Sequence, residues 1–489
     1  MPSYREYKRL AAITAALMLG ASLTSSINAE TLQGALRQAY DTNPTLQAAR
    51  AGQRATDEGV NVELANGRPS LSASGSYSEN VERPNAFTAA ERSVSASTNF
   101  NVPIYSGGAV RNAINAAKLR VESGQNDLRG TESSIFSAVV AAYMDVIRDS
   151  AIVSLNRQNV KALEVNLRAS RDRFEVGDVT RTDVAQSESR LSLARADLQR
   201  SGSNLIASKE RYISLVGASP DNLEMPPALP GLPASADEAV AIALRDNGDI
   251  LSAQKARDAA RYDVKVAKAQ AAPRLSAFAQ GSYQDYLKTQ PNYPTFTPHS
   301  SSATVGANLT LPLYQGGRPG ALARQSAAKE ARAIENAIAI ERNVIAQTRS
   351  AYASWQASLQ AIESTRTAVE AAALSLEGVK AENSVGNRTI LDILNAEQEA
   401  LNARVQLVTA ERNAYVAGFS LLAAMGHAEA RDLSLEGGAL YNAADHYAQV
   451  KGKLFDYDFG SAPKAVSTTT AQIPATDAEP ANIVRPAGQ

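Results

Sequence analysis

The chain has 489 residues, with 49 basic and 50 acidic side chains and no cysteine. The balanced charge excludes the basic surface that nucleic-acid binding requires, and the lack of cysteine excludes disulfides, thiol chemistry and a lipid anchor on an amino-terminal cysteine. The length alone would correspond to about three ordinary domains, but a long internal repeat overrides that expectation.

The first 29 residues are predicted to be a secretory signal peptide. Arg5, Lys8 and Arg9 form its positively charged start, and an apolar run of 14 residues follows from Leu10 to Leu23. This run is shorter than the about 20 residues that a membrane-spanning helix needs. Ala29 supplies the small residue expected at a cleavage site. We therefore expect a mature chain that begins near residue 30, rather than a chain held by an uncleaved anchor.

The rest of the chain contains one unit twice, with a constant offset of 209 positions. A repeat this long indicates a duplicated, domain-sized unit, because solenoids repeat every 20 to 50 residues or so. The predicted repeats cover residues 30–219 and 236–430, and a proline-rich linker joins them at 220–235. The strand-to-helix exits carry the motif that shows the offset best: Pro103, Tyr105, Gly107 and Gly108, then Pro312, Tyr314, Gly316 and Gly317.

Each repeat is predicted to start with a helical stretch that ends near Pro69 or Pro273 and then to form two β-strands. The four strands are expected at about 70–80, 93–105, 274–284 and 302–314. Apolar and small polar residues alternate along them, which is typical of a strand with lipid on one face and water on the other. A half-buried strand of a soluble sheet would show the same alternation.

Four such strands cannot form a complete membrane barrel, because known barrels start at about eight strands. Open sheet edges cannot face lipid either, since their backbone groups would lack hydrogen-bond partners. The chain is therefore expected to oligomerise. Two chains would give a barrel filled by its own side chains, whereas three would leave room for a lumen.

A long antiparallel coiled-coil hairpin is predicted after each second strand, at about 109–218 and 320–425. Apolar residues recur every seventh position, which is typical of a coiled-coil seam. These residues are Val146, Val153, Val160 and Leu167 in the first hairpin, and Trp355, Ile362, Val369 and Leu376 in the second. We expect all eight positions to lie in the cores of the hairpins.

The two hairpin tips share a second motif at the same offset. Gly177, Thr180 and Asp183 in the first tip match Gly386, Thr389 and Asp392 in the second. The glycines are expected to relieve the chain reversal, and each threonine and aspartate to form a capping box on the returning helix. Beyond the second repeat we expect a carboxy-terminal extension at 431–457 and a disordered tail at 458–489, since the tail is rich in Ser, Thr, Ala and Pro without apolar periodicity.

The duplicated strand pair, the glycine exits and the tip motifs, in this order and twice, resemble the TolC family of outer-membrane channel-tunnels. The resemblance covers about residues 30 to 430, and the segment 431–457 resembles the extension of alphaproteobacterial members. It implies a mainly α fold with a membrane β-barrel. In this arrangement a homotrimer forms a 12-stranded barrel in the outer membrane and an α-helical tunnel across the Gram-negative periplasm.

The resemblance also implies a passive exit duct for tripartite multidrug efflux, type I protein secretion, or both. A periplasmic adaptor (membrane fusion protein) and an inner-membrane pump or ABC exporter would be its partners, beside outer-membrane lipid. The sequence has no phosphate-binding glycine loop, and its three histidines lack metal-site spacing. We therefore expect neither an enzyme nor a cofactor or metal.

Two other classes of protein fit the pattern less well. A periplasmic coiled-coil adaptor would have a single hairpin and an amino-terminal anchor, so the duplication argues against it. A diffusion porin would use its residues mainly for strands, so the long helices argue against it.

The resemblance places a periplasmic gate at the hairpin tips. Arg388 of the second tip would bond to Thr182 and Asp183 of the first, and Asp392 would form an acidic ring. The family's gate tyrosine corresponds to Asn383, and the second aspartate of its ring to Asn395, so the closed state would be held more loosely. The adaptor would contact the tip segments Val176-Gly177 and Val385-Gly386. If the tip residues only cap their helices, no gate follows from them.

Overall fold

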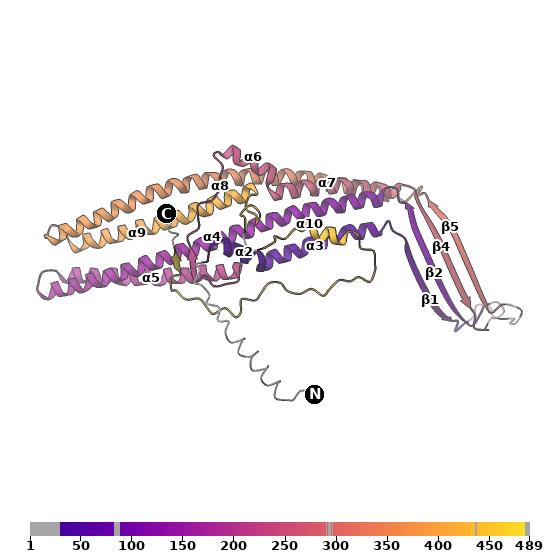
Figure 1. The fold of residues 1–489 in the computed structure, drawn as a ribbon, viewed down its shortest axis with the longest axis horizontal. Coiled ribbons are helices and arrows are strands. Elements are labelled where there is room, and N and C mark those ends of the chain that lie inside the picture. The colour runs from indigo at the N-terminus through magenta and orange to yellow at the C-terminus, as the bar shows by residue number, and fades with distance from the viewer. Residues whose placement is uncertain are drawn as a thin grey trace, which may run out of the picture.

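The computed structural model describes residues 30–484, except 83–88, 290, 292–294, 296 and 436–437. The predicted signal peptide, 1–29, lies outside the described residues. The described chain is elongated, with the strands at one end, the two hairpin tips at the other and short helices packed along the middle (Figure 1).

The two repeats contain the same elements in the same order. In the first they are α2 (Leu32–Thr42), α3 (Pro44–Ala65), β1 (Ser70–Glu79), β2 (Arg92–Tyr105), α4 (Ala109–Glu175) and α5 (Arg181–Val216). In the second they are α6 (Ala236–Asp246), α7 (Gly248–Lys268), β4 (Arg274–Asp285), β5 (His299–Thr310), α8 (Arg318–Ser384) and α9 (Ile390–Met425). Both outgoing helices have 67 residues and both returning helices have 36, in accordance with the constant offset.

A matched pair of asparagines connects the short helices of each repeat to its hairpin. Asn43 accepts hydrogen bonds from the first backbone N–H groups of α3, and its side-chain amide donates to the carbonyl of Leu215 at 2.9 Å. Asn247 caps α7 in the same way and donates to the carbonyl of Ala424 at 3.0 Å. Each amide therefore caps a helix start and also bonds to the last turn of a returning helix.

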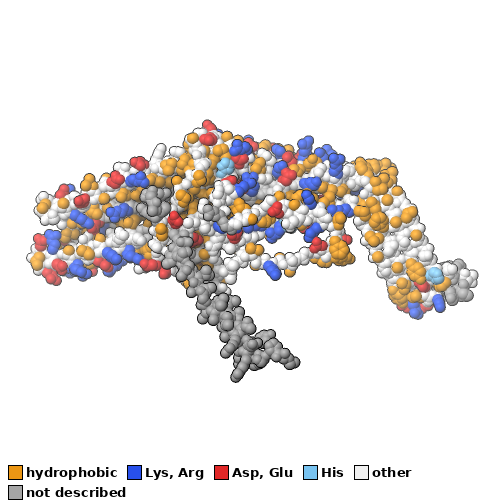
Figure 2. Space-filling view, in the orientation of Figure 1, with side chains coloured by type: hydrophobic (Ala, Val, Ile, Leu, Met, Phe, Trp, Pro, Cys, Tyr) orange, Lys and Arg blue, Asp and Glu red, His pale blue; other side chains and the backbone are white. Residues whose placement is uncertain are grey.

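The four long strands form one antiparallel sheet in the order β1-β2-β4-β5. Serine pairs join neighbouring strands across its polar face, at 2.8 Å for Ser74–Ser97, Ser76–Ser95 and Ser282–Ser302. Figure 2 shows hydrophobic side chains gathered over the strands, whereas charged side chains are spread mainly over the helices. Leu71, Val305 and Leu309 are largely exposed on the apolar face.

The predicted end of the fourth strand is wrong. We expected it at 302–314, but β5 begins at His299 and ends at Thr310, so Leu311 and Leu313 follow the strand. Thr310 pairs with Arg274, which is the first residue of β4. The strand ends there because β4 offers no backbone partner beyond that position.

The main core lies at the middle of the chain, where α2, α4, α5 and α9 meet. Its largest fully buried side chains are Phe136, Tyr143, Tyr212 and Phe419. The Tyr143 hydroxyl donates to the carbonyl of Glu30 at 2.8 Å, and the Tyr212 hydroxyl donates to the Glu30 carboxylate at 2.6 Å. Burial raises the pKa of that carboxyl group.

The predicted seam is confirmed for the first hairpin, where Val146, Val153, Val160 and Leu167 are all buried. In the second hairpin Trp355, Val369 and Leu376 are only partly buried, so the expectation of a closed core is wrong there. The reason is that α4 lies among α5, α7, α9 and the short helices α2 and α3, whereas α8 has neighbours on fewer sides. In the described chain α8 buries three residues and α4 buries twenty.

The disordered-tail prediction is wrong for the last described residues. The short strand β6 (Asn482–Val484) pairs in parallel with β3 (Asn222–Glu224), which lies within the predicted linker. Arg157 forms an ion pair with Glu479 at 2.9 Å, and the Lys209 ammonium donates to the Glu479 carbonyl at 2.7 Å. The composition of the tail does not predict this ordered structure, because the structure comes from backbone pairing and ion pairs with residues far away in the sequence.

We expect Leu205→Ala to lower the thermal unfolding midpoint clearly, because Leu205 is 0% exposed in the core. Removing a buried leucine costs about 2–5 kcal/mol. Leu193 is the matched control, since it lies on the same helix and is 59% exposed. Circular dichroism of detergent-solubilised protein measures both midpoints, and equal losses would contradict the assignment of the core.

Candidate functional site

Both hairpin tips reverse the chain with the same backbone geometry. Gly177 and Gly386 have φ values of 82° and 84°, in the left-handed region that favours glycine. The N–H of Gly177 donates to the carbonyl of Phe174 at 3.0 Å, and that of Asp178 donates to the carbonyl of Arg173 at 2.9 Å. The second tip repeats both bonds. These are the two bonds of a Schellman motif, so the predicted role of the glycines is confirmed.

A capping box then starts each returning helix, as predicted. The Asp183 N–H donates to the Thr180 hydroxyl oxygen at 3.2 Å, and the Asp183 carboxylate accepts from the Thr180 N–H at 2.9 Å. Thr389 and Asp392 form the same pair of bonds on α9. The hydrogen bonds from Thr180 lower the pKa of Asp183, and those from Thr389 lower the pKa of Asp392.

The structure does not bring the predicted gate residues together within the chain. Arg388 donates from Nε to the Glu382 carboxylate at 2.7 Å, and the Asn383 amide donates to the Arg388 carbonyl at 2.6 Å. Arg388 therefore braces its own tip rather than Thr182 or Asp183. In the first tip Arg173 and Asp178 form the corresponding brace at 2.6 Å. A contact of Arg388 with another chain stays a prediction.

Polar contacts that we did not predict connect the two hairpins beyond the tips. Arg190 of α5 donates to the Asn395 side chain of α9 at 2.7 Å. Glu397 of α9 accepts from Asn166 of α4 at 2.8 Å and pairs with Lys380 of α8 at 3.0 Å. Glu397 is buried, and a buried carboxylate requires such partners. An acidic residue on an otherwise apolar helix face was the only sequence signal for this connection.

The strand-to-helix exits also have the backbone that their glycines predicted. Gly107, Gly108, Gly316 and Gly317 all have positive φ values, between 58° and 82°. Gly108 and Gly317 occupy the cap positions of α4 and α8. The double glycine therefore lets the chain that leaves a strand turn into a helix of 67 residues.

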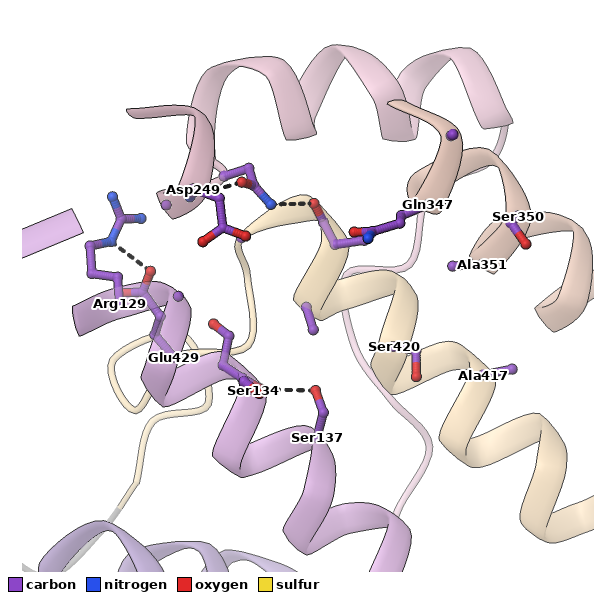
Figure 3. A pocket seen from close by; sticks show the side chains of 18 of the residues that line it. Arg129, Ser134, Ser137, Asp249, Gln347, Ser350, Ala351, Ala417, Ser420 and Glu429 are labelled. Carbon is purple, nitrogen blue, oxygen red and sulfur yellow. Dashed lines mark hydrogen bonds and ion pairs between the residues drawn. The ribbon is translucent and has the colours of Figure 1, made fainter. Parts of the chain in front are cut away.

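A cavity of about 710 Å³ lies where α4, α7, α8 and α9 meet. Figure 3 shows Arg129, Asp249, Gln347 and Glu429 around it, with Arg129 bonded to Glu429 at 2.6 Å. Burial raises the pKa of Asp249. The Arg129–Glu429 ion pair joins α4 to the segment that follows α9.

Within the part of the chain that the structure describes, no helix is both long and apolar enough to cross a membrane. The His, Asp and Glu residues described there form no group of three that could hold a metal ion.

The sequence matches the family described as outer membrane efflux protein over residues 35–218 and 239–427. The chain belongs to this family. The two matched segments correspond to the two repeats, so the family is shown by the same units that carry the hairpins and strands. Family and fold are those of outer-membrane channel proteins, which extend into the periplasm.

Curated relatives cover most of the chain. It is 34% identical to the outer membrane efflux protein BepC of Brucella suis, over 92% of this chain and 97% of the relative. It is 25% identical to the outer membrane protein TolC of Escherichia coli, over 85% of this chain and 87% of the relative. The alkaline protease secretion protein AprF of Pseudomonas aeruginosa is 25% identical over 63% of this chain and 64% of its own length.

Solved structures share the fold at lower identity. The CmeC outer membrane channel of Campylobacter jejuni matches with a TM-score of 0.73 and 17% identity, over 81% of this chain and 85% of that one. The outer membrane protein VceC of Vibrio cholerae matches with a TM-score of 0.69 and 22% identity, over 81% and 96%.

We expect Thr180→Ala to destabilise the first turn of α5 by about 1 kcal/mol, because it removes a capping hydroxyl. Hydrogen exchange of the tip amides measures this loss. Ser192→Ala is the control, since Ser192 lies on the same helix and bonds only to the carbonyl of Glu188. The pKa of Asp183 is lowered in the folded protein. Its contribution to the stability of this turn is therefore present above the unfolded pKa and should disappear as the pH falls through the folded pKa. Protection that is insensitive to both changes would contradict the capping box.

Proposed function

We propose that this chain is the passive exit duct of an export system, and that three copies assemble around one lumen. The single observation that supports this most strongly is the open sheet, in which β1 and β5 have neighbours on one side only within the described chain. Backbone groups at an edge need partners in lipid, so β5 of one copy would pair with β1 of the next. Three copies would give a barrel of twelve strands.

The helices support the same assembly. The second hairpin leaves the seam around Trp355 partly open, and Ile338 and Leu359 of α8 are exposed. A neighbouring copy would cover this face and complete a ring of helices. The ring would continue the barrel lumen through the periplasm as a tunnel.

The tips would form the periplasmic gate of this tunnel. Arg388 and Thr182 are exposed, and Asp183 keeps a carboxylate oxygen outside its capping bonds with Thr180. In the assembly Arg388 would exchange Glu382 for Thr182 or Asp183 of a neighbouring hairpin. Asp392 would contribute the acidic ring, and Asn383 would leave the latch weaker than a tyrosine. Opening would also strain the Arg190–Asn395 contact between the two hairpins of a chain.

An adaptor would bind the same end from outside. Val176 and Val385 are 80% and 70% exposed at the two tips, each next to a glycine with a left-handed backbone. Paired apolar side chains on rigid turns are suited to a protein contact. An inner-membrane pump or ABC exporter would supply the energy for export, as a passive channel requires.

The relatives support two kinds of cargo. One is named as an efflux protein and another as a protease secretion protein. We propose that the chain serves efflux, type I secretion or both, because one lumen can accept either cargo from different pumps.

The gate proposal predicts that Arg388→Ser raises the conductance of single channels in planar bilayers. Removing the guanidinium would leave Asp183 unpaired near other carboxylates, and like charges repel. Arg173→Ser is the matched control, because it breaks the equivalent brace with Asp178 in the first tip. Equal conductance in wild type and Arg388→Ser, or equal increases in both variants, would assign Arg388 to local bracing alone.

Deleting the gene tests the export role directly. We expect the deletion strain to become sensitive to drugs, to lose secreted proteins, or both, and the wild-type gene to restore each phenotype. Unchanged drug sensitivity together with an unchanged set of secreted proteins would contradict the proposed function.

A further inference from the structure

The carboxy-terminal extension exposes a run of large apolar side chains. Residues 451–459, here called the aromatic loop, follow helix α10 (Ala443–Val450). Leu454, Phe455, Tyr457 and Phe459 are between 73% and 85% exposed. Exposing so many apolar groups close together is unfavourable in water, and such a patch commonly marks a surface that contacts a protein or a membrane.

Three contacts fix the direction of this segment along α3. His446 bonds to Asp57 at 3.0 Å, Asn61 donates to the Val450 carbonyl at 3.0 Å, and Arg68 donates to the Lys453 carbonyl at 3.2 Å. The contacts advance together along both segments toward the sheet. The last one lies two residues before β1 begins at Ser70. The aromatic loop is therefore held beside the start of a strand.

The same place is the level at which strands turn into helices. Gly67 lies against Val110 in the first turn of α4, where an added Cβ would come within 2.9 Å of its side chain. Tyr105 and Tyr314, at the strand exits, are exposed as well. Aromatic residues concentrate at membrane–water interfaces, because their rings are apolar and their polar atoms remain hydrated. The aromatic loop lies at the same height along the molecule as these strand exits.

The internal contacts of the loop give it a defined shape. The Tyr457 ring lies between those of Phe455 and Phe459, with centroids 5.8 Å and 6.2 Å apart and edge-to-face geometry. Lys453 forms an ion pair with Asp458 at 2.8 Å, so these two charges offset each other. Apolar contact, rather than net charge, would therefore dominate its binding.

We propose that the aromatic loop inserts into the headgroup region of the periplasmic leaflet of the outer membrane and anchors each chain to phospholipid there. Its position beside the start of β1, at the level of the strand exits, favours lipid over a second copy of the chain. The inference rests on the outer-membrane location of the family and goes beyond the proposed export role.

A tryptophan placed in the loop tests the proposal. Tyr457→Trp is combined with Trp355→Phe, and the full-length trimer is reconstituted into phosphatidylethanolamine–phosphatidylglycerol vesicles whose acyl chains carry bromine. Wild-type protein is the built-in control, because Trp355, its single tryptophan, packs against the core in the middle of the chain. We expect bromine to quench the loop tryptophan by about half, because interfacial side chains reach the start of the acyl chains. The fluorescence of Trp355 in wild type should not change, at low and high salt alike.

Two results would overturn the proposal. One is the absence of bromine quenching in the Tyr457→Trp variant when its trimers still conduct ions. The other is protection of the loop tryptophan from aqueous acrylamide together with bromine quenching no greater than that of Trp355 in wild type, which would show that protein covers the loop. Conductance measured on the same vesicles shows that the trimers are assembled. Bromine quenching would support the lipid contact even if the deletion strain showed no export defect, so the two proposals can fail separately.

Discussion

Hydrogen bonding at the edges of the four-stranded sheet is the constraint on which the rest of the molecule depends. Within the described chain β1 and β5 each pair on one side, and their unpaired backbone groups are costly in lipid. In the proposed assembly, pairing between copies would satisfy them and would fix the positions of the helices that follow. Because Gly107, Gly108 and their counterparts start a long helix shortly after each second strand, closing the sheet into a barrel would also arrange the hairpins in a ring.

Duplication produced two hairpins of equal length that differ in their surroundings. The first packs against α7, α9 and the short amino-terminal helices, so α4 buries twenty residues. The second lies at the side of the chain, so α8 buries three of its described residues. Asn43 and Asn247 make matching contacts, which shows that local geometry is the same in both repeats. The difference in burial fits a division of labour in which α4 and α9 contribute to the core, whereas α8 provides a surface for assembly.

The two ends of the molecule use short motifs in different ways. At the tips, the capping boxes and the Arg388–Glu382 pair hold each turn by itself, so a gate can form only by exchanging these local partners for others. At the strand end, Arg68 and Asp57 hold the carboxy-terminal extension against α3. Rigid local turns at one end and a tethered aromatic loop at the other suit a duct that must meet two different environments.

The sequence by itself determined the duplicated unit, the four strands, both long hairpins, the glycine exits and the capping boxes, because each depends on residues close together in the chain. Only the tertiary structure decided the partners of Arg388 and Glu397, the ordered tail strand β6, the early end of β5 and the partial exposure of Trp355. A heptad pattern specifies which side of a helix is apolar, but not whether a neighbour covers that side. Ion pairs and strand additions join residues hundreds of positions apart, and no local pattern records which of them will meet.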